Sequence, residues 1–198
     1  MKPVGVIEGR MVPLDRADVD TDQIMPKQFL KRIERTGFGE FVFFDWRADP
    51  GFVLNDPRYD GANILITGPN FGSGSSREHA PWGLAQYGFE AILAPSFADI
   101  FRNNCAKIGL LTVVLPAKVC KQLIELATKD PAGATARIDL PAQTVTAAIG
   151  EWCFDFDPFT KHLLVEGLDD IGLTLRHADA ITAFEARRPA WMPVTVAR

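Results

Sequence analysis

A loop of glycine and serine residues carries the side chains best suited to chemistry in this sequence. The loop Gly72–Ser76 is followed directly by Arg77, Glu78 and His79. A glycine-rich loop that leads into a helix offers unpaired backbone N–H groups and the positive end of the helix dipole to an anion. Arg77 adds a planar fork that binds a carboxylate through two hydrogen bonds. The block therefore predicts a site for a small carboxylate.

Three better-known motifs with similar glycine spacing do not fit this block. A dinucleotide-binding loop requires a third glycine where Arg77 stands, and a phosphate-binding P-loop requires a Gly-Lys-Ser or Gly-Lys-Thr ending. A nucleophile elbow requires glycine at the position of Glu78. Carboxylate binding remains, beside the simpler interpretation that Ser75 or Ser76 only caps a helix and that residues 77–79 form a surface cluster.

A second polar cluster lies near the N-terminus. Asp18, Asp20 and Asp22 precede a basic stretch from Lys27 to Arg35. The acids do not make a calcium loop, because the glycine and glutamate that an EF-hand needs at its sixth and twelfth positions are missing. The basic stretch is either a solvated surface or a flexible loop that closes on an anionic substrate.

Cysteine and histidine residues are few and widely separated. Cys105, Cys120 and Cys153 are odd in number and have no C-x-x-C spacing. This argues against a disulfide framework and against an iron–sulfur site built from this chain alone. The three histidines have no metal-binding spacing either. We therefore expect no metal held by this chain.

The composition is typical of a globular protein and disfavours several kinds of partner. The 198 residues are 47% hydrophobic and 23% charged, with a net charge of −4, which gives no general attraction for nucleic acid or an anionic membrane. No run approaches the ~18 apolar residues of a membrane span. Glu8 and Arg10 interrupt any signal peptide. We expect one domain, residues 1–198, in the cytoplasm.

Short apolar runs between turn residues predict the elements that position the loop. Strands are expected near residues 4–7, 11–14, 63–67, 91–94 and 110–115, helices at 75–87, 97–107 and 119–128, and a hairpin within 135–149. The aromatic stretch 40–60 is expected to pack on the core or to meet a partner. Two or three short helices should follow in 160–187, then a loosely ordered tail at 188–198. This order predicts α/β architecture with parallel strands and an attached antiparallel part.

The polar blocks together resemble one protein family. Val19–Pro26, Phe29–Arg32, Arg35–Phe38 and Gly72–Ala80 are similar to the small subunit of 3-isopropylmalate dehydratase, and so are Ser96–Asn104 and Leu168–Leu175. The similarity covers nearly the whole chain. The Gly-Ser-Ser-Arg-Glu-His block is specific to the aconitase superfamily.

The resemblance implies a fold and a reaction. The fold would be a three-layer β/β/α swivelling domain like the last domain of aconitase, with short C-terminal helices and a flexible substrate loop at about 28–60. A separate large subunit would carry a [4Fe-4S] cluster, and this chain would bind no cofactor. Together they would form a hydro-lyase, as a heterodimer or larger assembly. It would interconvert 2-isopropylmalate and 3-isopropylmalate in leucine biosynthesis by dehydration and rehydration.

The resemblance also assigns roles within the glycine loop. Ser75 matches the family's catalytic base, and Ser76 and Arg77 match its ligands for the substrate carboxylate, so Ser75 and Arg77 are the catalytic pair. A helix N-terminus stabilises a charge by at most ~2 kcal/mol, or ~1.5 pKa units, which cannot by itself produce an alkoxide at neutral pH. We therefore expect Ser75 to act only in a closed complex from which water is excluded.

Further roles fall on the N-terminal cluster. Asp22 matches an aspartate that supports a histidine across the subunit interface. Either Arg32 or Arg35 matches another substrate ligand, and the two are not distinguished because the loop length differs from that of aconitase. Leu30 lies where the family reads the substrate's side group.

The sequence leaves other functions open. The chain could be the small subunit of a homoaconitase or of a methylmalate or citraconate hydratase. It could also be a stand-alone carboxylate-binding regulatory module. An RNA-binding role is disfavoured by the net charge of −4 and by the lack of an aromatic–basic stripe.

Overall fold

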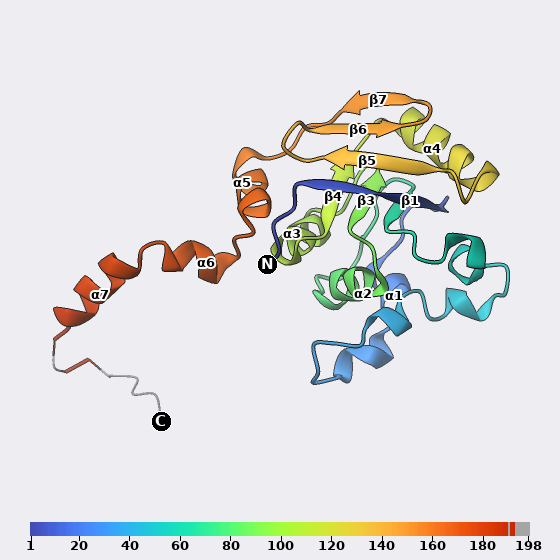
Figure 1. Ribbon diagram of the computed structural model, residues 1–198. Helices are drawn as coiled ribbons and strands as arrows, with labels where there is room; N and C mark the ends of the chain where they lie inside the picture. Colours follow the sequence, from blue (N-terminus) through green and yellow to red (C-terminus); the bar gives the residue numbers. More distant parts are fainter. Residues whose placement is uncertain (190, 193–198) are drawn as a thin grey trace.

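A seven-stranded mixed sheet organises the computed structural model, which describes residues 1–189, 191 and 192 (Figure 1). The strand order is β4-β3-β2-β1-β5-β6-β7. The parallel strands are β1 (Val6–Leu14), β2 (Ile64–Thr67), β3 (Ala91–Ala94) and β4 (Leu111–Val114). The antiparallel strands are β5 (Thr135–Asp139), β6 (Thr144–Ala147) and β7 (Gly150–Cys153). The predicted parallel strands with an attached antiparallel part are confirmed.

Strand β1 belongs to both parts of the sheet. Its first half runs antiparallel to β5, from Val6 opposite Asp139 to Arg10 opposite Thr135. Its second half runs parallel to β2, beginning with Met11 opposite Ile64. The two short runs predicted in 4–14 are therefore one nine-residue strand. Beyond it the sheet curls, so that β5–β7 lie as a layer over the parallel strands (Figure 1).

Both faces of the central parallel strands, β2 and β3, are buried. All four residues of β2 and of β3 are buried. Successive side chains of a strand point to opposite faces, so Ile64 and Ile66 enter a core shared with α4 (Ala117–Lys129) and the antiparallel strands. Leu65 enters a second core under α2 (His79–Tyr87) and α3 (Asp99–Ile108). This arrangement confirms the predicted β/β/α fold class.

Glycines end the two helices that flank the site. Gly88 follows α2 with φ 122°, and Gly109 follows α3 with φ 82°, as their positions predicted. The expected short C-terminal helices are α5 (Pro158–Glu166), α6 (Asp170–Leu175) and α7 (Ala178–Ala186). Strand β7 was not predicted, because its four residues show no clear alternation of polar and apolar side chains and read as part of a turn. The predicted loose tail at 188–198 lies largely outside the described residues.

Residues 27–60 fold as a series of short 3₁₀ helices. These span Lys27–Lys31, Gly39–Phe41, Trp46–Ala48, Val53–Asn55 and Pro57–Tyr59. Phe38, Val42 and Phe43 are fully buried, so the expected packing of this aromatic segment on the core is confirmed. Residues 31–37 are exposed. Flexibility of the segment in solution stays a prediction.

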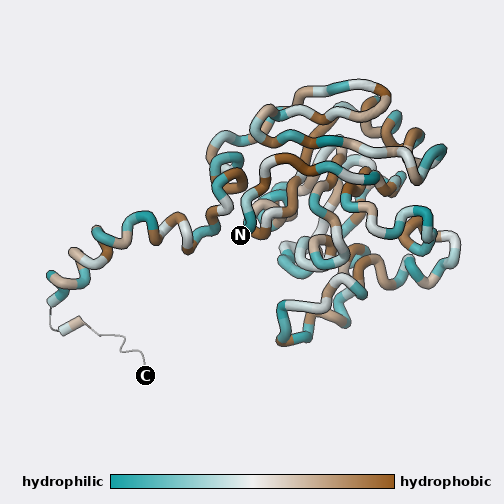
Figure 2. The backbone as a smooth tube through the Cα atoms, viewed as in Figure 1, coloured by the Kyte–Doolittle hydropathy of each residue, from teal (hydrophilic) through white to brown (hydrophobic). Residues whose placement is uncertain are grey.

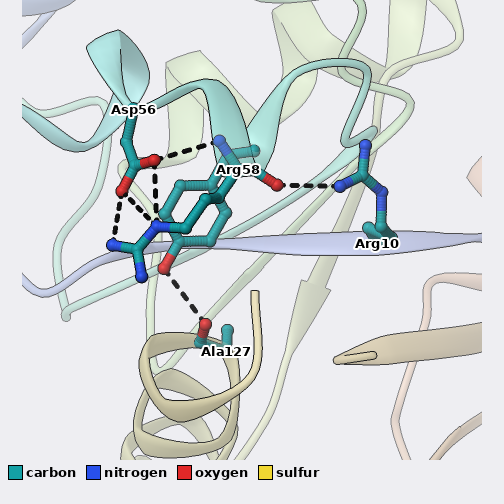
Figure 3. Close-up of polar contacts among 5 residues, drawn as sticks. Arg10, Asp56, Arg58 and Ala127 are labelled. Carbon is teal, nitrogen blue, oxygen red and sulfur yellow. Dashed lines mark hydrogen bonds and ion pairs between the residues drawn. The ribbon is translucent and has the colours of Figure 1, made fainter. Parts of the chain in front are cut away.

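The end of this segment is fastened to two elements of the body (Figure 3). Arg10 on β1 donates to the carbonyl oxygens of Arg58, at 2.8 Å, and of Asp60. The Tyr59 hydroxyl donates to the carbonyl oxygen of Ala127 on α4 at 3.0 Å. The chain therefore returns to the sheet at a defined position before β2 begins.

Candidate active site

Two segments distant in the sequence join at the glycine loop. The N–H groups of Gly72 and Ser73 donate to the Val19 carbonyl oxygen at 2.8 and 3.2 Å. In return, the Thr21 N–H donates to the Ser73 carbonyl oxygen at 2.8 Å. The Thr21 hydroxyl donates to the Ser75 carbonyl oxygen at 3.0 Å. The acidic turn and the glycine loop, which the sequence presents as two clusters, therefore make one site.

A capping box orients the acidic turn. The Asp20 carboxylate accepts from the Gln23 N–H at 2.8 Å, and the Gln23 side chain accepts from the Asp20 N–H at 2.9 Å. This reciprocal pair starts the four-residue helix α1 (Thr21–Ile24). Asp20 is thereby committed to helix capping, and Asp22 is held in the first turn beside the glycine loop.

Asp22, Arg77 and Ser75 are in direct contact. Arg77 donates from Nη1 to Asp22 Oδ1 and from Nη2 to the Ser75 Oγ, the latter at 3.3 Å. Lys27 Nζ lies 3.3 Å from the other oxygen of Asp22. The Arg77 side chain is 17% exposed, whereas that of Asp22 is 36% exposed. The sequence prediction missed Lys27, whose only signal was its place at the start of the basic stretch.

The helix after the loop begins later than predicted. Neither Ser75 nor Ser76 caps it: α2 starts at His79, and its N-cap, Glu78, makes no side-chain hydrogen bond. The backbone of residues 72–75 is instead hydrogen-bonded to residues 19–21, which draws the loop away from helical geometry. Ser75 therefore precedes α2 by four residues, and the helix dipole acts mainly within the first turn.

A different helix offers its N-terminus to the site. An open cleft of about 260 Å³ is lined by Thr21, Ser75 and Arg77 on one side and by Ala98 and the first turn of α3 on the other. The first N–H groups of a helix have no acceptor within it. An anionic group in this cleft would thus meet Arg77 and the positive end of α3, and Asp99 in the first turn of α3 also lines the cleft and would oppose it.

The remaining predicted site residues lie apart from this contact group. Arg32 is within 4 Å of Glu34 and Glu40 and covers the ring of Phe41 at 5.1 Å. Arg35 lies 5.6 Å from the ring centre of Trp82. Neighbouring acids and a ring thus hold Arg32, and a ring lies beside Arg35.

Two further predicted ligands lack contacts with the group. Leu30 packs, partly buried, against the core below α2, and Ser76 is exposed. Within the part of the chain that the structure describes, no hydrogen bond or ion pair joins Leu30, Ser76, Arg32 or Arg35 to Asp22, Ser75 or Arg77.

His79 belongs to an aromatic cluster and not to a polar surface cluster. Its ring centre lies 5.4 Å from that of Phe38 and 5.0 Å from that of Trp82. Burial lowers the pKa of His79, an effect that Glu78 opposes and Arg77 reinforces. The neutral imidazole is therefore favoured in the folded chain.

The cysteines and acids of the described residues form no metal centre. Among residues 1–189, 191 and 192, no three or more His, Cys, Asp or Glu side chains gather as a metal site. Cys105 and Cys120 are buried, and burial raises the pKa of Cys120 to about 11. Cys153 is exposed.

None of the described helices is both long enough and apolar enough to cross a membrane.

Comparison with known proteins identifies the family. The aconitase C-terminal domain model matches residues 1–118, and the model for the C-terminal domain of the 3-isopropylmalate dehydratase small subunit matches residues 170–195. The 3-isopropylmalate dehydratase small subunit of Rubrobacter xylanophilus is 55% identical over 193 residues, covering 98% of each chain. That of Acidothermus cellulolyticus is 56% identical over 195 residues, with the same coverage. The chain belongs to this family of small subunits.

A solved structure agrees with the fold. The crystal structure of 3-isopropylmalate dehydratase from Methanocaldococcus jannaschii superposes with a TM-score of 0.64 at 23% sequence identity. The match covers 91% of this chain and 99% of that one. The two relatives therefore confirm the family that the sequence motifs resembled, and the solved structure agrees with the fold.

Proposed function

We propose that this chain provides half of the active site of a 3-isopropylmalate dehydratase. With a large subunit it would interconvert 2-isopropylmalate and 3-isopropylmalate by removing and re-adding water. The family resemblance assigns a [4Fe-4S] cluster to the large subunit, where it would activate the leaving hydroxyl as a Lewis acid. The observation that carries the proposal is the contact group of Asp22, Arg77 and Ser75 beside the cleft.

Arg77 suits the binding of a substrate carboxylate. Its guanidinium already holds an anionic oxygen, that of Asp22, and still contacts the Ser75 hydroxyl. A substrate carboxylate would compete with Asp22 for this fork, while Lys27, 3.3 Å from Asp22, would keep that carboxylate paired. Partner exchange at Arg77 therefore leaves no charge uncompensated, which is the condition for a low-cost switch.

Ser75 suits proton abstraction only with help. A hydroxyl that accepts a hydrogen bond from a cation is more readily deprotonated, and Arg77 Nη2 provides that bond at 3.3 Å. Yet Ser75 is exposed, so water screens the Arg77 contact, and its place four residues before α2 leaves the helix dipole little effect on it. Closure of the large subunit over the cleft would remove that water and strengthen the Arg77 contact. The free chain should therefore exchange no proton at the substrate carbon.

Reconstitution with the large subunit under anaerobic conditions tests the proposal. The wild-type pair should interconvert the two isopropylmalates. Ser75→Ala should abolish activity, and Arg77→Lys should lower kcat/KM roughly 100-fold, because lysine keeps the charge and loses the fork. Arg58→Lys is the matched control: Arg58 donates from Nε and Nη2 to the Asp56 carboxylate elsewhere on the surface (Figure 3). Full activity in Ser75→Ala would contradict the proposal.

The same preparation separates the alternatives. Homoaconitate and methylmalate, assayed beside isopropylmalate, distinguish the sister enzymes by their kcat/KM values. A regulatory module would bind a dicarboxylate by itself, so calorimetric titration of the free chain with 3-isopropylmalate distinguishes that function. Tight binding without the large subunit, combined with an inactive pair, would favour the module.

A further inference from the structure

The C-terminal arm, residues 170–189, presents apolar side chains that the described part of the chain leaves uncovered. It contains helices α6 and α7 and projects away from the body (Figure 1). Ile171, Leu175 and Phe184 are 71%, 62% and 60% exposed. Every residue from 178 to 186 is exposed. Figure 2 shows hydrophobic and hydrophilic positions alternating along this arm.

The root of the arm is anchored to the body by polar contacts. The Met1 ammonium group donates to the Gly167 carbonyl oxygen at 3.1 Å and lies 3.7 Å from Asp169. The Val4 N–H donates to the Leu164 carbonyl oxygen at 2.8 Å. Gly167 has φ 67°, and a Cβ there would lie 2.9 Å from the Met1 carbonyl oxygen. These contacts and a tight turn therefore set where the arm leaves the body.

Each helix of the arm carries a stripe suited to a groove. Ile171 and Leu175 are spaced i, i+4 on α6, and Ile181 and Phe184 are spaced i, i+3 on α7, the spacing that places side chains on one face. Helices of six and nine residues are marginal in water without tertiary packing. An apolar groove that receives these stripes would both cover and stabilise them, as in helix-in-groove recognition.

The two family matches cover the first part of the body and the arm, and leave the rest of the body unmatched. The aconitase-type match covers residues 1–118, residues 119–169 fall in neither match, and the arm falls in the match described as the C-terminal domain of the small subunit. The arm therefore belongs to a segment that is named for the small subunit, in which this domain is a separate chain. A covalent linker holds a domain near its partner at a high effective concentration. A separate chain has no such linker and must bind its partner through its own contacts. The arm offers about 20 residues, the number that each side of a standard interface uses.

We propose that residues 170–189 dock into an apolar groove on the large subunit and hold the two subunits together. The inference rests on the proposed function for the identity of that partner. The docking lies outside the Ser75–Arg77 contact group, so it sets affinity and leaves the chemistry to the cleft. A second copy of this chain is the competing occupant, and the experiment distinguishes the two.

The test uses the full chain with Leu175→Ser and Phe184→Ser combined. Both side chains are mostly exposed, so thermal unfolding of the free subunit should match the wild type. Ile149→Ser is the matched control, because Ile149 is a 46% exposed apolar residue in the turn between β6 and β7. In surface-immobilised binding, the Kd for the large subunit should rise at least tenfold in the double variant and stay unchanged in the control. Activity at saturating small subunit should be retained.

Two outcomes would overturn the docking. One is an unchanged Kd for the large subunit in the double variant. The other is a wild-type subunit that sediments as a dimer and a double variant that sediments as a monomer, with equal Kd for the large subunit. A tight but inactive wild-type pair, whose Kd still depends on Leu175 and Phe184, would refute the proposed isomerase function and uphold the docking.

Discussion

Gly72, at the start of the glycine loop, should tolerate no side chain. It has φ 77°, and a Cβ there would lie 2.1 Å from Cγ of Phe101, whose side chain is 2% exposed. A positive φ costs an L-residue about 1–2 kcal/mol, and forcing a buried group aside costs about 1–3 kcal/mol more. We therefore expect Gly72→Ala to destabilise the chain by about 2–5 kcal/mol. At about 2–4 °C per kcal/mol for this size, Tm should fall by about 4–20 °C.

Two other glycines separate the components of that cost. Gly109 has φ 82°, but a Cβ there would lie no nearer than 3.6 Å to any neighbour, so Gly109→Ala should show the conformational cost alone. Gly5 has neither a positive φ nor a neighbour within 4 Å, so Gly5→Ala should leave Tm nearly unchanged. Calorimetric scans of the three variants give the comparison.

A double variant tests the clash itself. Phe101→Ala removes the ring that the new methyl group would strike, so Gly72→Ala with Phe101→Ala should be less unstable than the sum of the single variants. If Gly72→Ala lowers Tm no more than Gly109→Ala does, the close approach of the loop to Phe101 does not prevent a side chain at position 72. The reasoning would then be wrong.

Two further predictions concern titratable groups. Cys153 is exposed, whereas Cys105 and Cys120 are buried with raised pKa values. Ellman's reagent at about pH 8 should therefore titrate one thiol rapidly in the native chain and three after unfolding. Two thiols that react rapidly in the native chain would contradict the burial of Cys105 and Cys120. Because burial lowers the pKa of His79, the unfolded chain binds the extra proton first, and stability should fall as pH drops through about 6.5, the ordinary histidine value. His79→Gln should flatten the dependence of Tm on pH between about 7 and 5, and an unaltered profile would show that His79 does not cause it.

Features that follow local rules were predictable from the amino-acid sequence. Buried strands were recognisable from short apolar runs such as Ile64–Thr67, because a strand covered on both faces must be apolar throughout. Helix ends were recognisable at Gly88 and Gly109, because a positive φ favours glycine. The ability of Arg77 to pair with a carboxylate, here that of Asp22, followed from its side-chain chemistry, which does not depend on the fold.

The assembly of the site, in contrast, depends on tertiary contacts. Arg77 contacts Asp22 across 55 residues of sequence, and no local pattern announces that pairing. The start of α2 at His79 follows from hydrogen bonds that residues 19–21 make to the glycine loop, so a capping rule placed it too early. The N-terminus of α3 faces the cleft because β2 and β3 are parallel, so that the loops that lead from them to α2 and α3 begin at the same edge of the sheet. Contacts between distant segments are set by sheet order and register, which a single sequence does not encode in any local window.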